Sequence, residues 1–443
     1  MFRLLGAAVA LIALFAAGAG AVRVTEAAYL DTAVAQAESY TTPAEYTAVS
    51  TQFASTSVAL SDGWVWIWGT KGRGMGGNGV ADQRDPSPDP VYGLPAVTKV
   101  VGASDLNDTY GTFGALTASG EVYTWGANQY GRLGIGRPSG ASDFRSTPQR
   151  VTMPDGSRVI DIGSMRATIA VLTENGDVYT WGSGQYGQAG NGQSSAGDGP
   201  NRPFLVVSNV HSMHVGQRVT WVVTRDNEVF WWGRSYTGEA GNGTGTTTNR
   251  SRPTALPPLT AFARGCEGPA VAEYDPSNAC SIRAITSSRW AGAMLLDTGE
   301  LRTFGSTERG QVGRGGARLQ VLPVAIGGPV TQVSAGNYHF TALTEAGEAW
   351  GWGDNSQWAA TGNVRQDGSL GQGTRNAEVP FRLPLRGLVA VGGSRDTSYA
   401  TRNDSVLIGW GDGRLGAIPG QERPRQSFAP LALPGIRITE LGP

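Results

Sequence analysis

A Trp-Gly dipeptide followed by a glycine-rich tail recurs along this chain, and it constrains the fold more than any other feature. The stretch GEVYTWGANQYGRLGIG at residues 120–136 returns as GDVYTWGSGQYGQAGNG at residues 176–192. Seven aromatic-Gly pairs occur in all, and they begin at Trp68, Trp125, Trp181, Trp232, Phe304, Trp352 and Trp410. Successive pairs are 57, 56, 51, 72, 48 and 58 residues apart. Self-similarity at such a period indicates a solenoid, a propeller or an array.

The content of one unit favours a propeller. Residues 330–355, VTQVSAGNYHFTALTEAGEAWGWGDN, contain three short β-prone runs separated by turns. Small turn dipeptides stand between the second and third runs, at Asp62-Gly63, Ser119-Gly120, Asn175-Gly176, Thr298-Gly299 and Ala346-Gly347. Such dipeptides are typical of tight β-hairpins. A Gly-rich loop and a Pro-containing run such as TPQRV then supply a fourth strand. The sequence therefore predicts an all-β, seven-bladed β-propeller of four-stranded blades over residues 45–443.

These units resemble the repeats of the regulator of chromosome condensation family. The family pattern combines an Ala-Leu-Thr run, a Gly-x-Val-x-x-Trp-Gly run and a Gly-x-Leu-Gly-x-Gly tail, and residues 120–136 follow it closely. The resemblance implies a seven-bladed propeller. The best-known function in this family is nucleotide exchange on the small nuclear GTPase Ran, but no segment of this sequence matches the exchange-factor wedge. The sixth unit departs from the pattern through a longer loop, and the seventh through a shorter one.

Composition and charge limit the classes of partner. Glycine accounts for 65 of the 443 residues, about twice its usual share of roughly 7%, which predicts many tight turns. The formal net charge is −1, so no strong field attracts nucleic acid or anionic lipid. Lysine occurs only at Lys71 and Lys99, and this preference for arginine is typical of a GC-rich bacterial genome.

The first 21 residues, MFRLLGAAVALIALFAAGAGA, have the pattern of a signal peptide. Cleavage is expected after residue 21, or as late as residue 27, and residues 22–44 are expected to form an N-terminal stalk or linker. The alternative is an uncleaved membrane anchor, since the apolar run approaches the length of a membrane span. We therefore expect a bacterial protein that is secreted or held at the cell surface.

Cys266 and Cys280 are the two cysteines of the chain, and both lie in one irregular stretch. In an oxidising compartment they are expected to form a disulfide, the alternative being two free thiols. The insertion over residues 261–281 follows a fourth-strand run. Strand parity therefore predicts that it lies on the face opposite the Gly-rich loops.

The end of the chain offers strands that could close the ring. The tail PLALPGIRITELG parallels the fourth-strand and first-strand runs of the sixth unit, while EYTAVS near residue 45 offers a first strand of its own. An open ring would expose strand edges, so both termini are expected to meet in the blade that contains Trp68.

No known constellation for chemistry stands out. His211, His214 and His339 are the three histidines, and none is spaced for a metal site. Phosphate-binding and nucleophile-elbow motifs are also missing. We therefore predict no enzyme activity, no catalytic residues, no metal and no cofactor. The alternative is a hydrolase whose scattered acidic residues converge at the central channel.

The function favoured by these observations is binding of an extracellular or envelope protein by a monomeric interaction or scaffold module. A related alternative is inhibition of an extracellular enzyme, in the manner of the propeller-type β-lactamase inhibitor. Large side chains in loops are candidate anchors because interface energy concentrates in aromatic and arginine residues. Strand parity assigns one face to Tyr130, Tyr186, Tyr236, Trp290, Tyr338 and Trp358, with Arg73 and Arg132 nearby. The alternative is that these rings only cap the blade ends.

Overall fold

The computed structural model shows which parts of the chain form the propeller. It describes residues 46–52, 55–60, 63–82, 87–103, 111–136, 140, 142–194, 199–263, 281–314, 319–355, 360, 376–393, 397–403, 406–411 and 425–430. Side chains are described from Gly63 up to Gly411 within these ranges. The expected signal peptide, the stalk over 22–44, Trp358, Cys266, Cys280 and the tail after residue 430 all lie outside the described residues.

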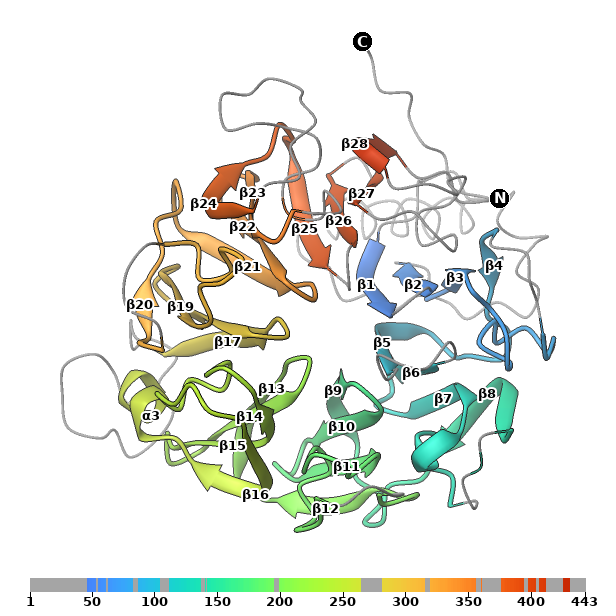
Figure 1. Ribbon diagram of the computed structural model, residues 1–443. Coiled ribbons are helices and arrows are strands. Elements are labelled where there is room, and N and C mark those ends of the chain that lie inside the picture. The colour runs from blue at the N-terminus through green and yellow to red at the C-terminus, as the bar shows by residue number, and fades with distance from the viewer. Residues whose placement is uncertain are drawn as a thin grey trace, which may run out of the picture.

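The strands pair into seven antiparallel four-stranded sheets arranged in a ring (Figure 1). Sheet 1 contains β1 (Tyr46–Gln52), β2 (Ser55–Leu60), β3 (Val65–Gly69) and β4 (Asp89–Pro90), and sheet 2 contains β5 (Val97–Ala103), β6 (Thr112–Thr117), β7 (Val122–Ala127) and β8 (Phe144–Val151). Sheet 3 contains β9 (Val159–Met165), β10 (Thr168–Thr173), β11 (Val178–Gly182) and β12 (Phe204–Val207), and sheet 4 contains β13 (Val210–Val215), β14 (Val219–Thr224), β15 (Val229–Ser235) and β16 (Thr248–Ala255). Sheet 5 contains β17 (Ile282–Ser287), β18 (Ala291–Leu296), β19 (Leu301–Gly305) and β20 (Leu322–Pro323), and sheet 6 contains β21 (Val330–Ala335), β22 (His339–Thr344), β23 (Ala349–Gly353) and β24 (Ala377–Arg382). Sheet 7 contains β25 (Leu388–Gly393), β26 (Thr397–Arg402), β27 (Leu407–Gly411) and β28 (Arg425–Pro430). The predicted all-β propeller of four-stranded blades is confirmed.

The first strand of each sheet lies innermost, and these strands form a closed circle. Each of β1, β5, β9, β13, β17 and β21 lies against the first strand of the next sheet, and β25 lies against β1. All four strands of sheet 1 come from residues 46–90. Within the described residues, the ring therefore closes through packing of sheet 7 against sheet 1. The expectation that the C-terminal tail joins sheet 1 concerns residues outside the described ranges.

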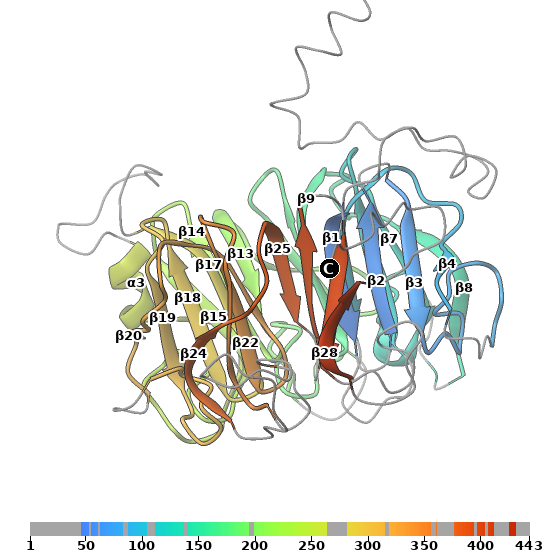
Figure 2. The same ribbon diagram turned by 90° about the horizontal axis from the view of Figure 1, so that it is seen from above.

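Five of the second strands are buried along their whole length, which explains their continuous apolar runs. Every residue of β6, β10, β14, β18 and β22 is buried. In a propeller, each sheet is covered on both faces by its neighbours, as the side view in Figure 2 shows. A central strand of such a sheet has no solvent face, so the usual alternation of apolar and polar residues is lost.

Tryptophans on the third strands connect neighbouring sheets. Trp125, Trp181, Trp232 and Trp352 are completely buried. Each indole Nε1 donates to a backbone oxygen of the preceding sheet, at Met75 (3.1 Å), Arg132 (2.9 Å), Gln188 (3.0 Å) and Gln311 (2.8 Å) respectively. In every case the acceptor lies seven residues after the aromatic of its own sheet. The recurring Trp therefore joins adjacent blades by both packing and a hydrogen bond.

Phe304 fills the same buried position in sheet 5 but has no N–H to donate. Trp221, on the second strand of sheet 4, donates instead to the oxygen of Ala240 at 3.0 Å. Trp221 and Phe304 belong to one core cluster. The prediction that Phe304 has the same role as the tryptophans thus holds for packing and not for the hydrogen bond.

In sheets 1 to 5, a glycine nine residues after the aromatic makes this packing possible. A Cβ on Gly134, whose φ is +68°, would come within 2.6 Å of the Trp181 indole nitrogen. Gly77, Gly190 and Gly313 face the tryptophan of the next sheet in the same way. The glycine-rich tail therefore recurs because each blade must admit the aromatic ring of its neighbour.

Within the described residues, one short α-helix interrupts the all-β pattern, and the sequence did not suggest it. Helix α3 (Pro257–Ala263) follows β16 and packs beside β15. Its buried residues, Leu259 and Ala263, are four positions apart and face one core cluster. Prolines suit a first helical turn because its N–H groups have no intrahelical acceptor. Among the described residues, no helix is long and apolar enough to span a membrane.

Candidate functional site

The turns between first and second strands share one face of the ring with the loops between third and fourth strands. Backbone hydrogen bonds join the two sets, for example from Ser183 N to Ala167 O at 2.9 Å and from Arg234 N to Arg218 O at 2.9 Å. We call this side the loop face. The opposite side, which carries the hairpins between second and third strands, is the hairpin face. The strand parity expected from the sequence is confirmed.

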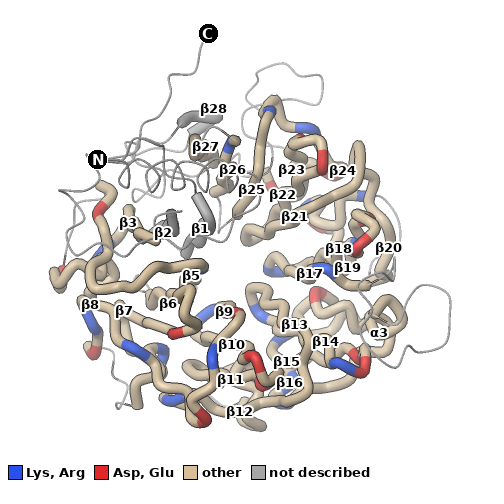
Figure 3. Tube along the Cα trace, turned by 180° about the vertical axis from the view of Figure 1, so that it is seen from behind, with Lys and Arg blue, Asp and Glu red and all other residues tan. Residues whose placement is uncertain are grey.

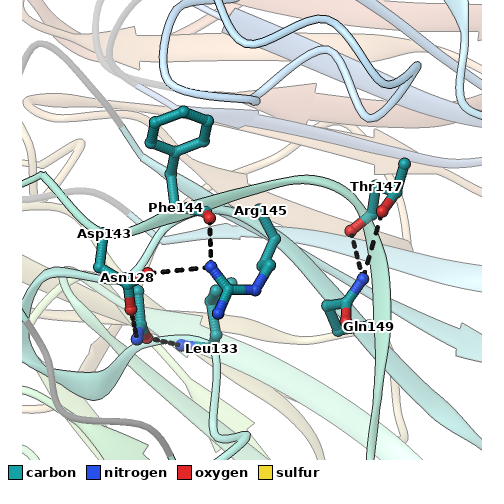
Figure 4. A network of polar contacts seen from close by, with 7 residues as sticks. All are labelled: Asn128, Leu133, Asp143, Phe144, Arg145, Thr147 and Gln149. Carbon is teal, nitrogen blue, oxygen red and sulfur yellow. Dashed lines mark hydrogen bonds and ion pairs between the residues drawn. The ribbon is translucent and has the colours of Figure 1, made fainter.

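The loop of sheet 2 shows how loop-face residues are positioned (Figure 4). Asn128 Oδ1 accepts from Leu133 N at 3.1 Å, and Asn128 Nδ2 donates to Asp143 at 2.6 Å. Arg145 holds the same carboxylate at 2.9 Å. Tyr130 sits inside this loop with a φ of +63°. Side-chain hydrogen bonds therefore hold both ends of the loop that contains Tyr130.

The structure separates the predicted binding residues into two groups. Tyr186, Tyr236, Trp290 and Tyr338 are half-buried or exposed and lie together on the loop face, as described below. Tyr130 belongs to the loop of sheet 2, with the Arg132 guanidinium 5.9 Å from its ring.

The two predicted arginines have other surroundings. The prediction that Arg132 contributes to the binding surface is wrong. Arg132 is completely buried, and its Nε donates to Gln129 O at 2.9 Å. It occupies the position seven residues after its tryptophan, where Gln188 and Gln311 are also buried. Its backbone oxygen serves Trp181, so Arg132 acts in the interior rather than on the surface. Arg73 is half-buried, and its backbone N–H donates to Asp82 at 3.0 Å.

Tyrosines and arginines alternate across sheets 3 and 4. The Arg234 guanidinium lies 4.3 Å from the ring of Tyr186 and 4.2 Å from the ring of Tyr236. The Arg166 guanidinium lies 5.3 Å from the ring of Tyr186, and the Arg218 guanidinium lies 5.2 Å from the ring of Tyr236. Guanidinium groups at these distances are attracted to the aromatic faces. We call these five residues the first stack.

A second stack continues the pattern across sheets 5 and 6. The rings of Trp290 and Tyr338 are 4.8 Å apart in an edge-on arrangement. Arg309 lies 5.2 Å from Trp290 and 4.5 Å from Tyr338, and Arg289 lies 5.7 Å from Tyr338. Arg309 also forms an ion pair with Asp354.

Backbone contacts hold the two stacks next to each other. Thr237 Oγ1 donates to Trp290 O at 2.9 Å, which joins the loop of sheet 4 to the turn of sheet 5. Arg289 N donates to Asn337 O at 2.8 Å, which joins that turn to sheet 6. Figure 3 shows Lys and Arg positions near the inner ends of β9, β13 and β17. The stacks thus form one surface supported by four consecutive blades.

Charge in this surface is unevenly balanced. Arg218 is only 3% exposed, and burial together with nearby Arg166, Arg289 and Arg234 lowers its pKa to about 10. Glu239 is completely buried and accepts from Tyr236 N at 2.6 Å and Thr237 N at 2.7 Å. Burial raises the pKa of Glu239, while those hydrogen bonds and Arg218 oppose the shift.

Sequence reasoning missed the arginines of the stacks. The sequence indicated the aromatic rings of this surface, which are Tyr186, Tyr236, Trp290 and Tyr338. However, the first-to-second turns of three consecutive units each contain an arginine, in SMRAT, GQRVT and SSRWA. That coincidence of Arg166, Arg218 and Arg289 was a readable signal, but their closeness across three blades depends on the ring.

The histidines have structural surroundings. His339 is buried, and its Nε2 lies 2.8 Å from Ser398 Oγ in sheet 7. His211 is exposed on β13, and His214 Nε2 lies 3.1 Å from Ser212 Oγ. Within the described ranges, no group of three His, Cys, Asp or Glu residues could hold a metal ion.

Comparison with known proteins finds relatives among repeat propellers. The chain is 29% identical over 390 residues to the ultraviolet-B receptor UVR8 of Arabidopsis thaliana, covering 86% of this chain and 80% of UVR8. It is 34% identical over 189 residues to the human E3 ubiquitin-protein ligase HERC2, which is 41% of this chain and only 4% of HERC2. Prp20p of Saccharomyces cerevisiae has a similar fold, with a TM-score of 0.64 and 16% identity over 89% of this chain and 87% of Prp20p.

Models of the regulator of chromosome condensation (RCC1) repeat match four segments of the chain. One model matches residues 119–164 and 298–343, and a second model of the same repeat matches residues 166–188 and 330–357. These matches include the Trp-Gly units and their hairpins. The matched segments are therefore RCC1 repeats.

Proposed function

We propose that this protein is a non-catalytic interaction module that binds a protein partner through its loop face. RCC1-repeat propellers fit such a role. Yeast Prp20p, which has this fold, has binding properties toward Gsp1p and histones. The observation that carries the proposal is the pair of arginine–aromatic stacks, which gathers four of the predicted anchors on one surface. Aromatic and arginine side chains are the residue types that dominate binding energy at protein interfaces.

The anchors of the first stack are accessible and held in place. Tyr236 is 36% exposed although it sits beside a buried carboxylate and under two guanidinium groups. Its backbone N–H is fixed by Glu239. An aromatic ring that is already ordered loses little conformational freedom when a partner binds, which favours affinity.

The test compares tyrosines on the two faces. The full chain is immobilised and used to capture proteins from extracellular and envelope fractions. Replacing both Tyr186 and Tyr236 by Ala should weaken binding of the captured partner by about 30-fold or more. Tyr92→Ala is the matched control, because Tyr92 is 41% exposed in the connection from β4 to β5, on the hairpin face. Equal loss in both variants, or no loss in the double variant, contradicts a loop-face site.

We also propose that the protein acts outside the cytoplasm. The support is the N-terminal sequence, with one early arginine, an apolar run and small residues around residue 21. Export should be accompanied by a disulfide between Cys266 and Cys280. Mass spectrometry of the protein from the culture medium should find an N-terminus between residues 22 and 28 and a mass two hydrogens lower than that of the reduced protein. Retention in the cytoplasm with two alkylatable thiols contradicts this proposal.

A further inference from the structure

Arg218 carries a charge that the described part of the protein does not neutralise. Its side chain is almost fully buried, yet its Nη1 has no hydrogen-bond partner within the described residues. Within the same ranges it makes no ion pair, and its guanidinium lies against the ring of Tyr236. Buried ionised groups are normally paired, because removing a charge from water without compensation is unfavourable. A buried guanidinium whose Nη1 lacks an acceptor indicates a site that an anion completes.

Two neighbouring arginines, both half-buried, also lack a carboxylate partner among the described residues. Arg234 and Arg289 contact aromatic rings and form no ion pair with any described residue. Arg309 in the second stack differs, because Asp354 neutralises it. On the loop face, Arg309 therefore has a carboxylate partner. Arg218, Arg234 and Arg289 form no ion pair with a described residue. Those three flank the junction between sheets 4 and 5.

Glu239 is the buried carboxylate beside Arg218, but its oxygens already serve the backbone of Tyr236 and Thr237. The corresponding residues of the neighbouring sheets are Gln188 and Gln311, which hold the backbone N–H groups of Tyr186 and Arg309 in the same way. An uncharged amide therefore suffices for the structural task. The carboxylate of Glu239 adds partial compensation for Arg218.

We infer that the loop face receives a carboxylate of an acidic protein segment at Arg218, with Arg234 and Arg289 at its sides and Tyr236 as its apolar wall. This inference rests on the proposed protein-binding function and specifies the chemistry of the partner. Guanidinium groups match carboxylates through two parallel hydrogen bonds. A nucleic acid requires a basic field that extends along a phosphate backbone, whereas this chain has a net charge of −1.

The experiment uses the purified full chain and a synthetic Glu-rich peptide as the probe. Titration at low salt should show saturable binding that weakens as salt is added. Arg218→Gln should weaken binding by about 30-fold or more, since the peptide carboxylate loses its buried partner. Arg225→Gln in the same sheet is the matched control, because Arg225 is an exposed arginine next to the hairpin at Asn227. It should bind the peptide like the unmodified protein.

A second readout separates binding from folding. Arg218→Gln should leave Tm unchanged or raise it, because it removes a buried unpaired charge. A large fall in Tm would show that Arg218 is a structural residue and would contradict the inference. Glu239→Gln should keep the fold, as Gln188 and Gln311 do, and should bind the peptide more tightly because a competing carboxylate is gone.

The outcomes distinguish this inference from the broader proposal. If the peptide fails to bind while the captured partner still depends on Tyr186 and Tyr236, the acidic chemistry is wrong and the loop-face function stands. If neither binding depends on the loop face, both are wrong. Inorganic phosphate and a single-stranded oligonucleotide serve as further probes. Binding of either with an affinity equal to or above that of the peptide overturns the assignment to an acidic protein segment.

Discussion

At the scale of single residues, one indole and one glycine explain why the Trp-Gly unit recurs. Trp181 donates to the Arg132 carbonyl of the preceding sheet at 2.9 Å, and Gly134 of that sheet leaves room for the ring. Neither residue reaches solvent, since both are buried. The Trp and the Gly of this motif therefore stabilise blade packing, while the candidate site uses other side chains of the loops and turns.

Trp181→Phe isolates the hydrogen bond from the packing. Phenylalanine keeps most of the ring but leaves the Arg132 carbonyl without its donor, so we expect a loss of about 1–3 kcal/mol in the free energy of unfolding. Trp181→Ala should cost more, about 3–5 kcal/mol, because it also opens a cavity. Denaturant unfolding measures both. No loss of stability in Trp181→Phe would show that the hydrogen bond is irrelevant.

Gly134→Ala tests the close approach to the ring. Gly134 and Gly79 have φ values of +68° and +91°, so alanine is strained at both positions. The two positions differ in their neighbours. A Cβ on Gly134 would meet the Trp181 indole, whereas nothing lies within 4 Å of a Cβ on Gly79. Gly79→Ala should cost about 1–2 kcal/mol, and Gly134→Ala about 1–3 kcal/mol more. Similar losses of stability would contradict a steric role.

At the scale of elements, the first residue of the second strand occupies a repeated position, and its side chain is buried in sheets 2, 3 and 6. Thr112 and Thr168 stand there in sheets 2 and 3, and each hydroxyl donates to a carbonyl of the adjoining loop. His339 stands there in sheet 6 and contacts Ser398 of sheet 7 instead. The side chain at this repeated position thus contacts either its own blade or the neighbouring blade.

His339 should make stability depend on pH. Burial lowers its pKa from the usual 6.5 to about 4. Because the folded pKa lies below the unfolded pKa, stability is complete above pH 6.5 and falls as the pH decreases toward 4. We expect a loss of about 2 kcal/mol between pH 7 and pH 5 from this group.

The matched variant is His339→Thr, which restores the residue found at this position in sheets 2 and 3. It should be less stable than the unmodified protein at pH 7, because the imidazole packing is lost, and should show a weaker pH dependence between pH 7 and pH 5. Thermal unfolding at the two pH values measures the difference. An unchanged pH dependence would assign the effect to other groups.

At the scale of the whole molecule, the ring couples distant parts of the chain. Strand β1 begins at Tyr46 and β25 begins at Leu388, yet they lie side by side at the centre of Figure 1. The loop face inherits this geometry, since turns from consecutive sheets converge around the centre. The two stacks extend over four blades and form one surface only in the closed ring.

Removing β1 should therefore affect the entire propeller. A chain that lacks residues 46–52 would expose the edge of β2 and lose the contact between sheets 1 and 7. We expect a large fall in Tm, aggregation at high protein concentration and loss of a single cooperative unfolding transition. Calorimetry and light scattering measure these effects. A variant that keeps its Tm would show that β1 does not close the ring.

The sequence by itself determined the repeating four-stranded unit, the parity of the faces and the residues of the blade interior. These features follow from local periodicity, from turn residues such as Gly120 and Gly176, and from the repetition of one packing solution. It also predicted the face on which Tyr186, Tyr236, Trp290 and Tyr338 lie, because parity depends only on strand order.

Only the tertiary structure decided which of these residues meet and how charge is distributed among them. Ring closure brings Arg218, Arg234 and Arg289 together from different turns and loops, and it buries Arg132, which the sequence suggested for the surface. Contacts between blades join residues 50 or more positions apart, such as Thr237 and Trp290. Local patterns contain no information on distances across blades, so burial and charge pairing on the loop face could not be derived from them.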